Sequence, residues 1–176
     1  MSELPRPVER ELEGHGAFDA LEDGYELTTT VFETRIDATD AEGKRDGRFR
    51  VTVSLPPLDA AVDGETVAPV VEDGWFETLE RRLEDTFTVA HTSTHEVPTV
   101  ERNGDTVRVT LEYVAWDARE GVEDAKALIE YVEGTYAQGL IPGYEYRGPA
   151  ATLLENAQSH GQEAAEGDGE SGGMPM

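Results

Sequence analysis

Apolar and polar positions alternate in two stretches of this chain, residues 48–55 and 106–116. A period of two predicts antiparallel strands with one face on a core and the other in water. Residues 25–38 are rich in β-branched and aromatic types, but their apolar positions change parity near Val31. We therefore expect one bulged strand there, paired with residues 48–55 across the polar loop 39–47.

A second hairpin is predicted at residues 103–104, Asn-Gly. This dipeptide is a strong hairpin signal, because a type I′ turn needs positive φ at both central residues. Residues 92–102 should then pair with the alternating strand that follows, with Val100 opposite Val107. Pro98 has no amide N–H to donate, so this strand is expected at an edge of the sheet.

Apolar positions at helical spacing predict helices between the hairpins. The longest covers residues 121–139 and buries Val122, Ala125, Leu128, Ile129, Val132 and Tyr136. Its outer face is expected to carry Glu120, Glu123, Asp124 and Glu130. Asp73 is the expected cap of an earlier helix that contains Phe76, Leu79 and Leu83. A short N-terminal helix is expected around residues 8–12 and resumes through 17–21.

The element order is helix–hairpin–helix–hairpin–helix. It predicts the α+β class, an antiparallel sheet of two hairpins with helices on one face. Residues 1–160 are expected to form a single α+β domain, with a C-terminal extension from about residue 140. Residues 161–176 are acidic and rich in glycine, and we expect them to be a disordered tail.

Charge narrows the classes of function. The chain has 38 acidic and 14 basic residues, a net charge of −24, and only two lysines. Molar salt screens such charge, so the composition is typical of a halophilic, cytoplasmic protein. Nucleic-acid binding is not expected, because it needs a basic stripe. The sequence shows no secretory signal and no membrane span, and the absence of cysteine excludes disulfides and thiolate metal sites.

Two histidines four residues apart, His91 and His95, raise the question of a metal site. On a strand they lie about 13 Å apart, too far to share one zinc ion. The predicted register instead sets His95 opposite Glu112 and His91 opposite Trp116, as a surface cross-strand pair. His91, His95 and Glu112 remain candidate ligand residues, while no metal, cofactor or catalytic residue is predicted.

Residues 136–149 differ from the acidic background, since they hold three tyrosines, two prolines and one acidic residue. Aromatic residues and arginine in a rigid loop suit a contact surface. The candidate contacts with a partner are Ile141, Tyr144, Tyr146 and Arg147. The alternative is that this segment packs back onto the domain and seals an edge of it, and the sequence leaves both interpretations open.

The acidic background, the long amphipathic helix and the segment "LIPGYEYRGPAATLL" resemble a family of small haloarchaeal proteins known only as a domain of unknown function. The resemblance spans residues of roughly 10 to 155 and implies a halophilic, cytosolic origin without any activity. The order of elements also resembles type III secretion chaperone-like and YbjN-type proteins, which are binding proteins and often dimeric.

We therefore expect a non-enzymatic, protein-binding or chaperone-like module. One alternative is a small enzyme or ligand carrier, with a pocket between sheet and helices and with His95 and Glu112 as its first candidate residues. Another is a structural or regulatory homodimer, formed through a sheet face that bears Val114 and Trp116. A bound cofactor or metabolite would favour the small enzyme or carrier, and a purely monomeric protein would exclude the homodimer.

Overall fold

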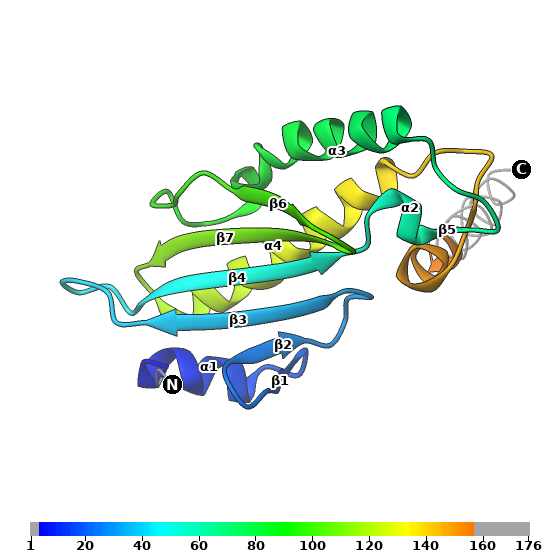
Figure 1. Ribbon diagram of the computed structural model, residues 1–176. Helices are drawn as coiled ribbons and strands as arrows, with labels where there is room; N and C mark the ends of the chain where they lie inside the picture. The colour runs from blue at the N-terminus through cyan, green and yellow to red at the C-terminus, as the bar shows by residue number, and fades with distance from the viewer. Residues whose placement is uncertain (1–3, 157–176) are drawn as a thin grey trace, which may run out of the picture.

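Six of the strands form one antiparallel sheet in the order β1-β2-β3-β4-β7-β6 (Figure 1). The structure is a computed structural model and describes residues 4–156. The strands are β1 (Phe18–Ala20), β2 (Tyr25–Leu27), β3 (Glu33–Thr39), β4 (Gly47–Leu55), β6 (Thr99–Asn103) and β7 (Thr106–Ala115). The helices α1 (Arg6–Gly14), α3 (Pro69–Leu83) and α4 (Ala118–Gln138) complete the main α+β domain, as predicted.

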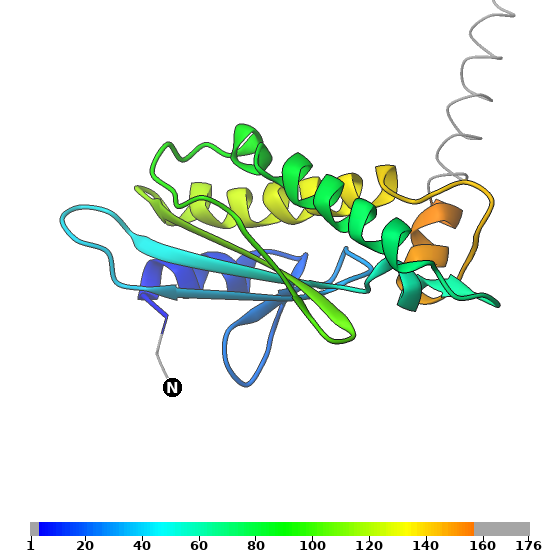
Figure 2. The same cartoon turned by 45° about the horizontal axis from the view of Figure 1, so that its top comes forward.

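The central strands β4 and β7 show the predicted alternation. Phe49, Val51 and Val53 on β4 are fully buried, and so are Val107, Val109 and Leu111 on β7. Helices α3 and α4 lie on the same side of the sheet (Figure 2). The apolar side chains therefore fill the space between the sheet and the helices, and the polar side chains of the same strands face solvent on the other side.

Helix α4 buries the whole apolar stripe expected from its spacing. Asp117 caps it, because its carboxylate accepts hydrogen bonds from the N–H groups of Arg119 and Glu120. One expectation for this helix is wrong. Asp124 does not lie on the outer face but is 1% exposed. It falls on the buried stripe because it precedes Leu128 by four residues and so shares its side of the helix.

The other helices differ from the predicted boundaries. Helix α3 begins at Pro69, four residues before Asp73, because proline at the first helical position already has the required φ. Trp75, rather than Phe76, joins Leu79 and Leu83 in the core. Helix α1 ends at Gly14 and does not resume over residues 17–21, where the chain forms β1.

Residues 25–38 form two strands and not one bulged strand. β2 and β3 pair antiparallel through Tyr25 and Ile36, and the change of parity near Val31 lies in the turn between them. The hydroxyl of Thr34 accepts a hydrogen bond from the N–H of Leu27 and closes this turn. The sheet therefore has six strands, since the predicted pair of hairpins gains β1 and β2 at one edge.

The second hairpin forms with a register two residues from the expected one. Asn103 pairs with Thr106, so Gly104 and Asp105 are the loop residues, and Val100 lies opposite Val109. Gly104 has φ +60°, whereas Asp105 does not have positive φ, which fits a type II′ turn with glycine first. An even shift keeps every side chain on its predicted face. β6 is also shorter than predicted, since residues 91–98 form no regular strand.

A small second sheet closes the end of the domain. β5 (Val62–Asp63) follows the short helix α2 (Leu58–Ala61) and pairs with β8 (Glu145–Tyr146) of the C-terminal extension. Residues 148–156 are helical and bury Ala150 and Leu153. The predicted tail, residues 161–176, lies outside the described residues. Within residues 4–156, no helix combines the length and apolar character that crossing a membrane requires.

Candidate functional site

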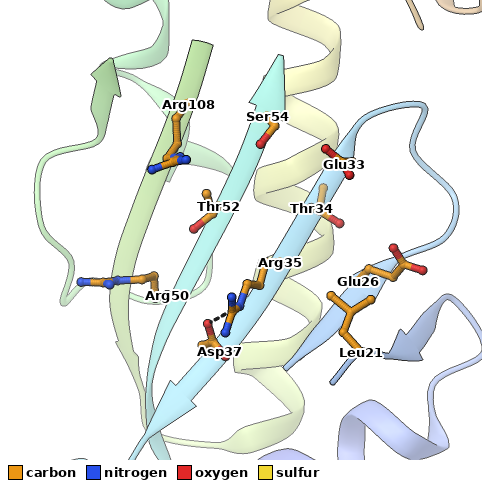
Figure 3. Close-up of a pocket in the computed structure, with 10 residues that line it drawn as sticks. All are labelled: Leu21, Glu26, Glu33, Thr34, Arg35, Asp37, Arg50, Thr52, Ser54 and Arg108. Atoms are coloured by element: carbon orange, nitrogen blue, oxygen red, sulfur yellow. Dashed lines mark ion pairs between the residues drawn. The ribbon is translucent and has the colours of Figure 1, made fainter. Parts of the chain in front are cut away.

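The face of the sheet opposite α4 carries a broad polar depression of about 550 Å³ (Figure 3). Its side chains come from neighbouring strands, because alternate residues of β3 and β4 point away from the core. Figure 3 shows Arg35 and Asp37 on β3, Thr52 and Ser54 on β4, and Arg108 on β7. The remaining lining residues are Leu21, Glu26, Glu33, Thr34 and Arg50. We call this uncovered surface the open face.

Two ion pairs organise the open face. Arg35 Nε lies 2.9 Å from an oxygen of Asp37 on the same strand. Arg50 reaches across to β7, where its Nη2 atom lies 2.6 Å from Glu112 Oε1. Both arginines are about half exposed, so each pair contributes little to stability.

Arg108 differs from these arginines because no ion pair involves it among residues 4–156. It lies directly opposite Ser54 on β4 and opposite Glu101 on β6. A guanidinium group offers five N–H donors and no acceptor. Arg108 therefore leaves its donors available, beside a serine hydroxyl, on the rim of the depression.

Further depressions continue the open face toward both edges of the sheet. One of about 360 Å³ includes Arg48 and Arg50, and another of about 300 Å³ includes Arg50, Thr99 and Glu101. Arg50 lines all three depressions, so they form one connected surface. This surface is large and shallow, which suits a macromolecular partner better than an enclosed small molecule.

The predicted positions of the histidines are wrong. His95 pairs with Tyr113, not with Glu112, because the irregular segment before β6 changes the register. Its ring stacks on Phe87, with 4.0 Å between ring centroids. His91 does not face Trp116 but contacts Asp124 of α4, with 2.9 Å between Nδ1 and Oδ1. No group of three or more potential metal ligands occurs among the described residues.

His95 and Glu112 do line one small depression together, next to Arg48. Its volume is about 50 Å³, which is far below that of an ordinary ligand site. Glu112 is engaged by Arg50, and Nδ1 of His95 lies 3.0 Å from the carbonyl oxygen of Glu96. The pair therefore offers no room for a substrate beside the two side chains.

Asp124 is the polar residue that sequence reasoning missed. Its buried carboxylate accepts hydrogen bonds from the N–H groups of His91 and Thr92 and contacts His91 Nδ1. These contacts tie the irregular segment before β6 to α4. The sequence did contain a signal for this role, since Asp124 lies four residues before Leu128 and therefore on the apolar stripe of α4. An acidic residue on such a stripe needs a hydrogen-bonding partner inside the fold.

The hydrogen bond to Asp124 and its negative charge raise the pKa of His91 above the ordinary value of 6.5, with smaller contributions from Glu120 and Glu123. Protonated His91 thus stabilises the fold below pH 6.5, and this contribution is lost as the pH rises through the higher folded pKa. NMR titration should show the raised pKa, and Asp124→Asn should lower it more than Glu120→Gln does. Equal effects of the two substitutions would contradict this assignment.

The C-terminal extension packs on the domain. The side chain of Tyr146 bonds to the backbone of Ile141, since its hydroxyl accepts from the N–H group at 2.7 Å and donates to the carbonyl at 2.8 Å. Arg147 Nε donates to the carbonyl of Ala60, and the ring of Tyr144 packs edge-on against Tyr146. These contacts fit the packing interpretation, while the role of the four residues as partner contacts stays a prediction.

Trp116 is 61% exposed and lies at the end of β7, with the guanidinium group of Arg45 5.1 Å from its ring centroid. Val114, two residues earlier on the open face, is partly buried.

Comparison with known proteins adds one finding. A family model, described only as a family of unknown function, matches residues 13–156. No curated protein and no solved structure matches the chain.

Proposed function

The chain belongs to that family of unknown function, DUF5813, and we propose that it is a non-enzymatic protein-binding module that docks an acidic protein segment on the open face of its sheet. The observation that supports this proposal is the ratio of arginines to carboxylates on the open face. The outward positions of β3, β4 and β7 hold four arginines, Arg35, Arg48, Arg50 and Arg108, and three carboxylates, Glu33, Asp37 and Glu112. The flanking segments add Glu26, Glu96 and Glu101, so the open face has six carboxylates to four arginines, a smaller acidic excess than that of the chain. The chain as a whole has 38 acidic and 14 basic residues.

This local balance decides which partner can approach. Over most of the surface an acidic segment meets a strong excess of like charge, which disfavours association. On the central strands arginine is in excess, and Arg108 has no intramolecular partner among the described residues. Carboxylates of the partner can pair there with guanidinium groups in bidentate geometry. A phosphate backbone is a poorer partner, because the face lacks a continuous basic stripe.

We place this module in the cytoplasm of a cell with molar salt. The support is the composition, with 38 acidic residues and only two lysines in 176 residues. At about 1 M salt the Debye length is roughly 3 Å, so only charges in direct contact interact strongly. The docking that we propose depends on such contact pairs and not on long-range attraction.

The test is an NMR titration of the ¹⁵N-labelled protein in molar KCl with a synthetic glutamate-rich peptide. We expect shifts of amide signals in β3, β4 and β7. Arg108→Gln should weaken binding about tenfold, since a hydrogen-bonded charge contributes about 1.5 kcal/mol or more. The matched control is Arg119→Gln on α4, because Arg119 is also exposed but lies on the helical side.

Three results would overturn the proposal. The first is an open face whose signals do not move at saturating peptide, and the second is an equal loss of binding in the Arg108 and Arg119 variants. The third is self-association without peptide, measured by sedimentation at several concentrations in molar KCl. If Trp116→Ser abolished that self-association, the face would belong to a homodimer.

A further inference from the structure

We infer that a groove beside α3 binds an apolar protein segment that carries a carboxylate. The groove has a volume of about 400 Å³ and lies between α3 and the chain that follows α4. Its α3 wall consists of Val70, Val71, Gly74, Trp75, Thr78 and Arg82. Its other wall consists of Gln138, Gly139, Leu140, Ile141 and Pro142. None of these residues belongs to the open face, so this inference is independent of the proposed function.

The lining is chemically unlike the rest of the chain. It contains no acidic residue, although the chain has 38 in 176 residues. Its single charged residue is Arg82, and no ion pair involves Arg82 among the described residues. Val70 at the rim is 78% exposed. An apolar, acid-free groove on so acidic a protein is complementary to an apolar segment with a negative end.

Trp75 supplies the second observation. Its side chain is buried, with 5% of the residue exposed, and its ring packs edge-on against Tyr136. Its Nε1–H group has no hydrogen-bond partner among residues 4–156. An unmade hydrogen bond of a buried donor costs about 1–3 kcal/mol. A partner that brings an acceptor to this N–H group would recover that free energy.

Gly139 lies next to this N–H group. A β-carbon at this position would lie 3.4 Å from Trp75 Nε1 and would make no contact closer than that. Because Nε1 is itself buried, the ring of Trp75 must turn slightly for an acceptor in the groove to reach its N–H group. The side chains of Trp75 and Arg82 can only donate hydrogen bonds, so they favour an occupant with a carbonyl or carboxylate oxygen.

The far wall of the groove is held in place before any partner binds. The hydroxyl of Tyr146 bonds to both the N–H and the carbonyl of Ile141, and the N–H group of Leu140 donates to Ala137. β8 fixes Tyr146 by pairing with β5. A preformed wall lowers the entropic cost of binding. The predicted contact residue Ile141 thus lines the groove, and Tyr146 positions it.

The spacing along α3 gives the occupant a direction. Val71 and Arg82 are eleven residues apart, which is about 16 Å on a helix. This length matches about five residues of extended chain. The apolar side chains of the occupant belong beside Val70 and Leu140, and its carboxylate belongs beside Arg82. A protein segment fits this open, elongated shape better than a compact metabolite does.

The test uses a five-residue peptide of leucine and valine with a blocked amino end and a free carboxyl end, and its amidated counterpart. The chain has two tryptophans, so the indole N–H signal of Trp116 is an internal reference in the NMR spectrum. We expect the peptide to shift the Trp75 indole signal downfield and to leave that of Trp116 in place. The free carboxylate should bind about tenfold more tightly than the amide.

Matched variants locate the site. Val70→Glu should weaken binding at least tenfold, whereas Val97→Glu should not, although both valines are 78% exposed. Arg82→Gln should remove the preference for the free carboxylate. An unmoved Trp75 signal, or equal losses in the two valine variants, would overturn the inference. Equally tight binding of octanoate would assign the groove to small aliphatic acids and would also overturn it.

Discussion

Dialysis from about 2 M KCl into a buffer of about 10 mM ionic strength is expected to unfold the protein. The net charge is −24, and at that ionic strength the Debye length is about 30 Å, so carboxylates across the whole surface repel one another. Folded domains are stable by only about 5–15 kcal/mol. Because the fold cannot offset strong self-repulsion, we expect loss of the native NMR dispersion and recovery on return to molar salt.

Two controls separate screening from other effects of salt. Sucrose favours burial without screening charge, so it should restore less structure than KCl does. A variant with Glu77, Glu80 and Glu84 replaced by glutamine removes three exposed acids of α3 and its C-terminal end. That variant should fold at a lower KCl concentration than the parent. A native spectrum that persists at low salt would contradict the screening argument.

The central fold could be predicted because the spacing of apolar residues within each strand and helix shows which of its faces is buried. The alternation in β4 and the apolar stripe of α4 were both confirmed. The register of the second hairpin was wrong by two residues, because the sequence does not distinguish between the two turn types that contain Gly104. Since the shift is even, the error left the predicted faces intact.

Contacts between distant segments could not be predicted in the same way. Asp124 is buried because it accepts hydrogen bonds from His91 and Thr92, which lie more than 30 residues earlier. The residues near Asp124 in the sequence do not indicate which distant N–H groups will bind its carboxylate. The groove beside α3 is a similar case, because its two walls are separated by more than 50 residues and only the fold shows that both lack acids.

The fold also brings together arginines that are far apart in the sequence. Arg48 and Arg50 are exposed on β4. The sheet adds Arg35 from β3 and Arg108 from β7 to the same face. One arginine-rich surface and one acid-free groove thus stand out on a strongly acidic protein. Both are places where another acidic molecule can approach without strong repulsion.

A single methyl group at Gly121 is expected to destabilise the protein strongly. A β-carbon there would clash with the ring of Phe49, at 2.6 Å from Cζ, and with Ala115 Cβ at 2.8 Å. Phe49 stacks on Tyr113, whose hydroxyl donates a 2.6 Å hydrogen bond to the carbonyl of Gly121. The contact therefore cannot relax without moving α4 from the sheet. Overpacking costs about 1–3 kcal/mol or more.

Gly134 is the matched control in the same helix. A β-carbon at Gly134 meets no atom within 4 Å, so Gly134→Ala should stabilise α4 by about 1 kcal/mol through helix propensity. Gly121→Ala gains the same propensity but should still lose about 2 kcal/mol net. The two variants should thus move the urea midpoint in molar KCl in opposite directions. Urea is the suitable denaturant because it adds no charge, and equal midpoints would show that α4 does not sit tightly against Phe49.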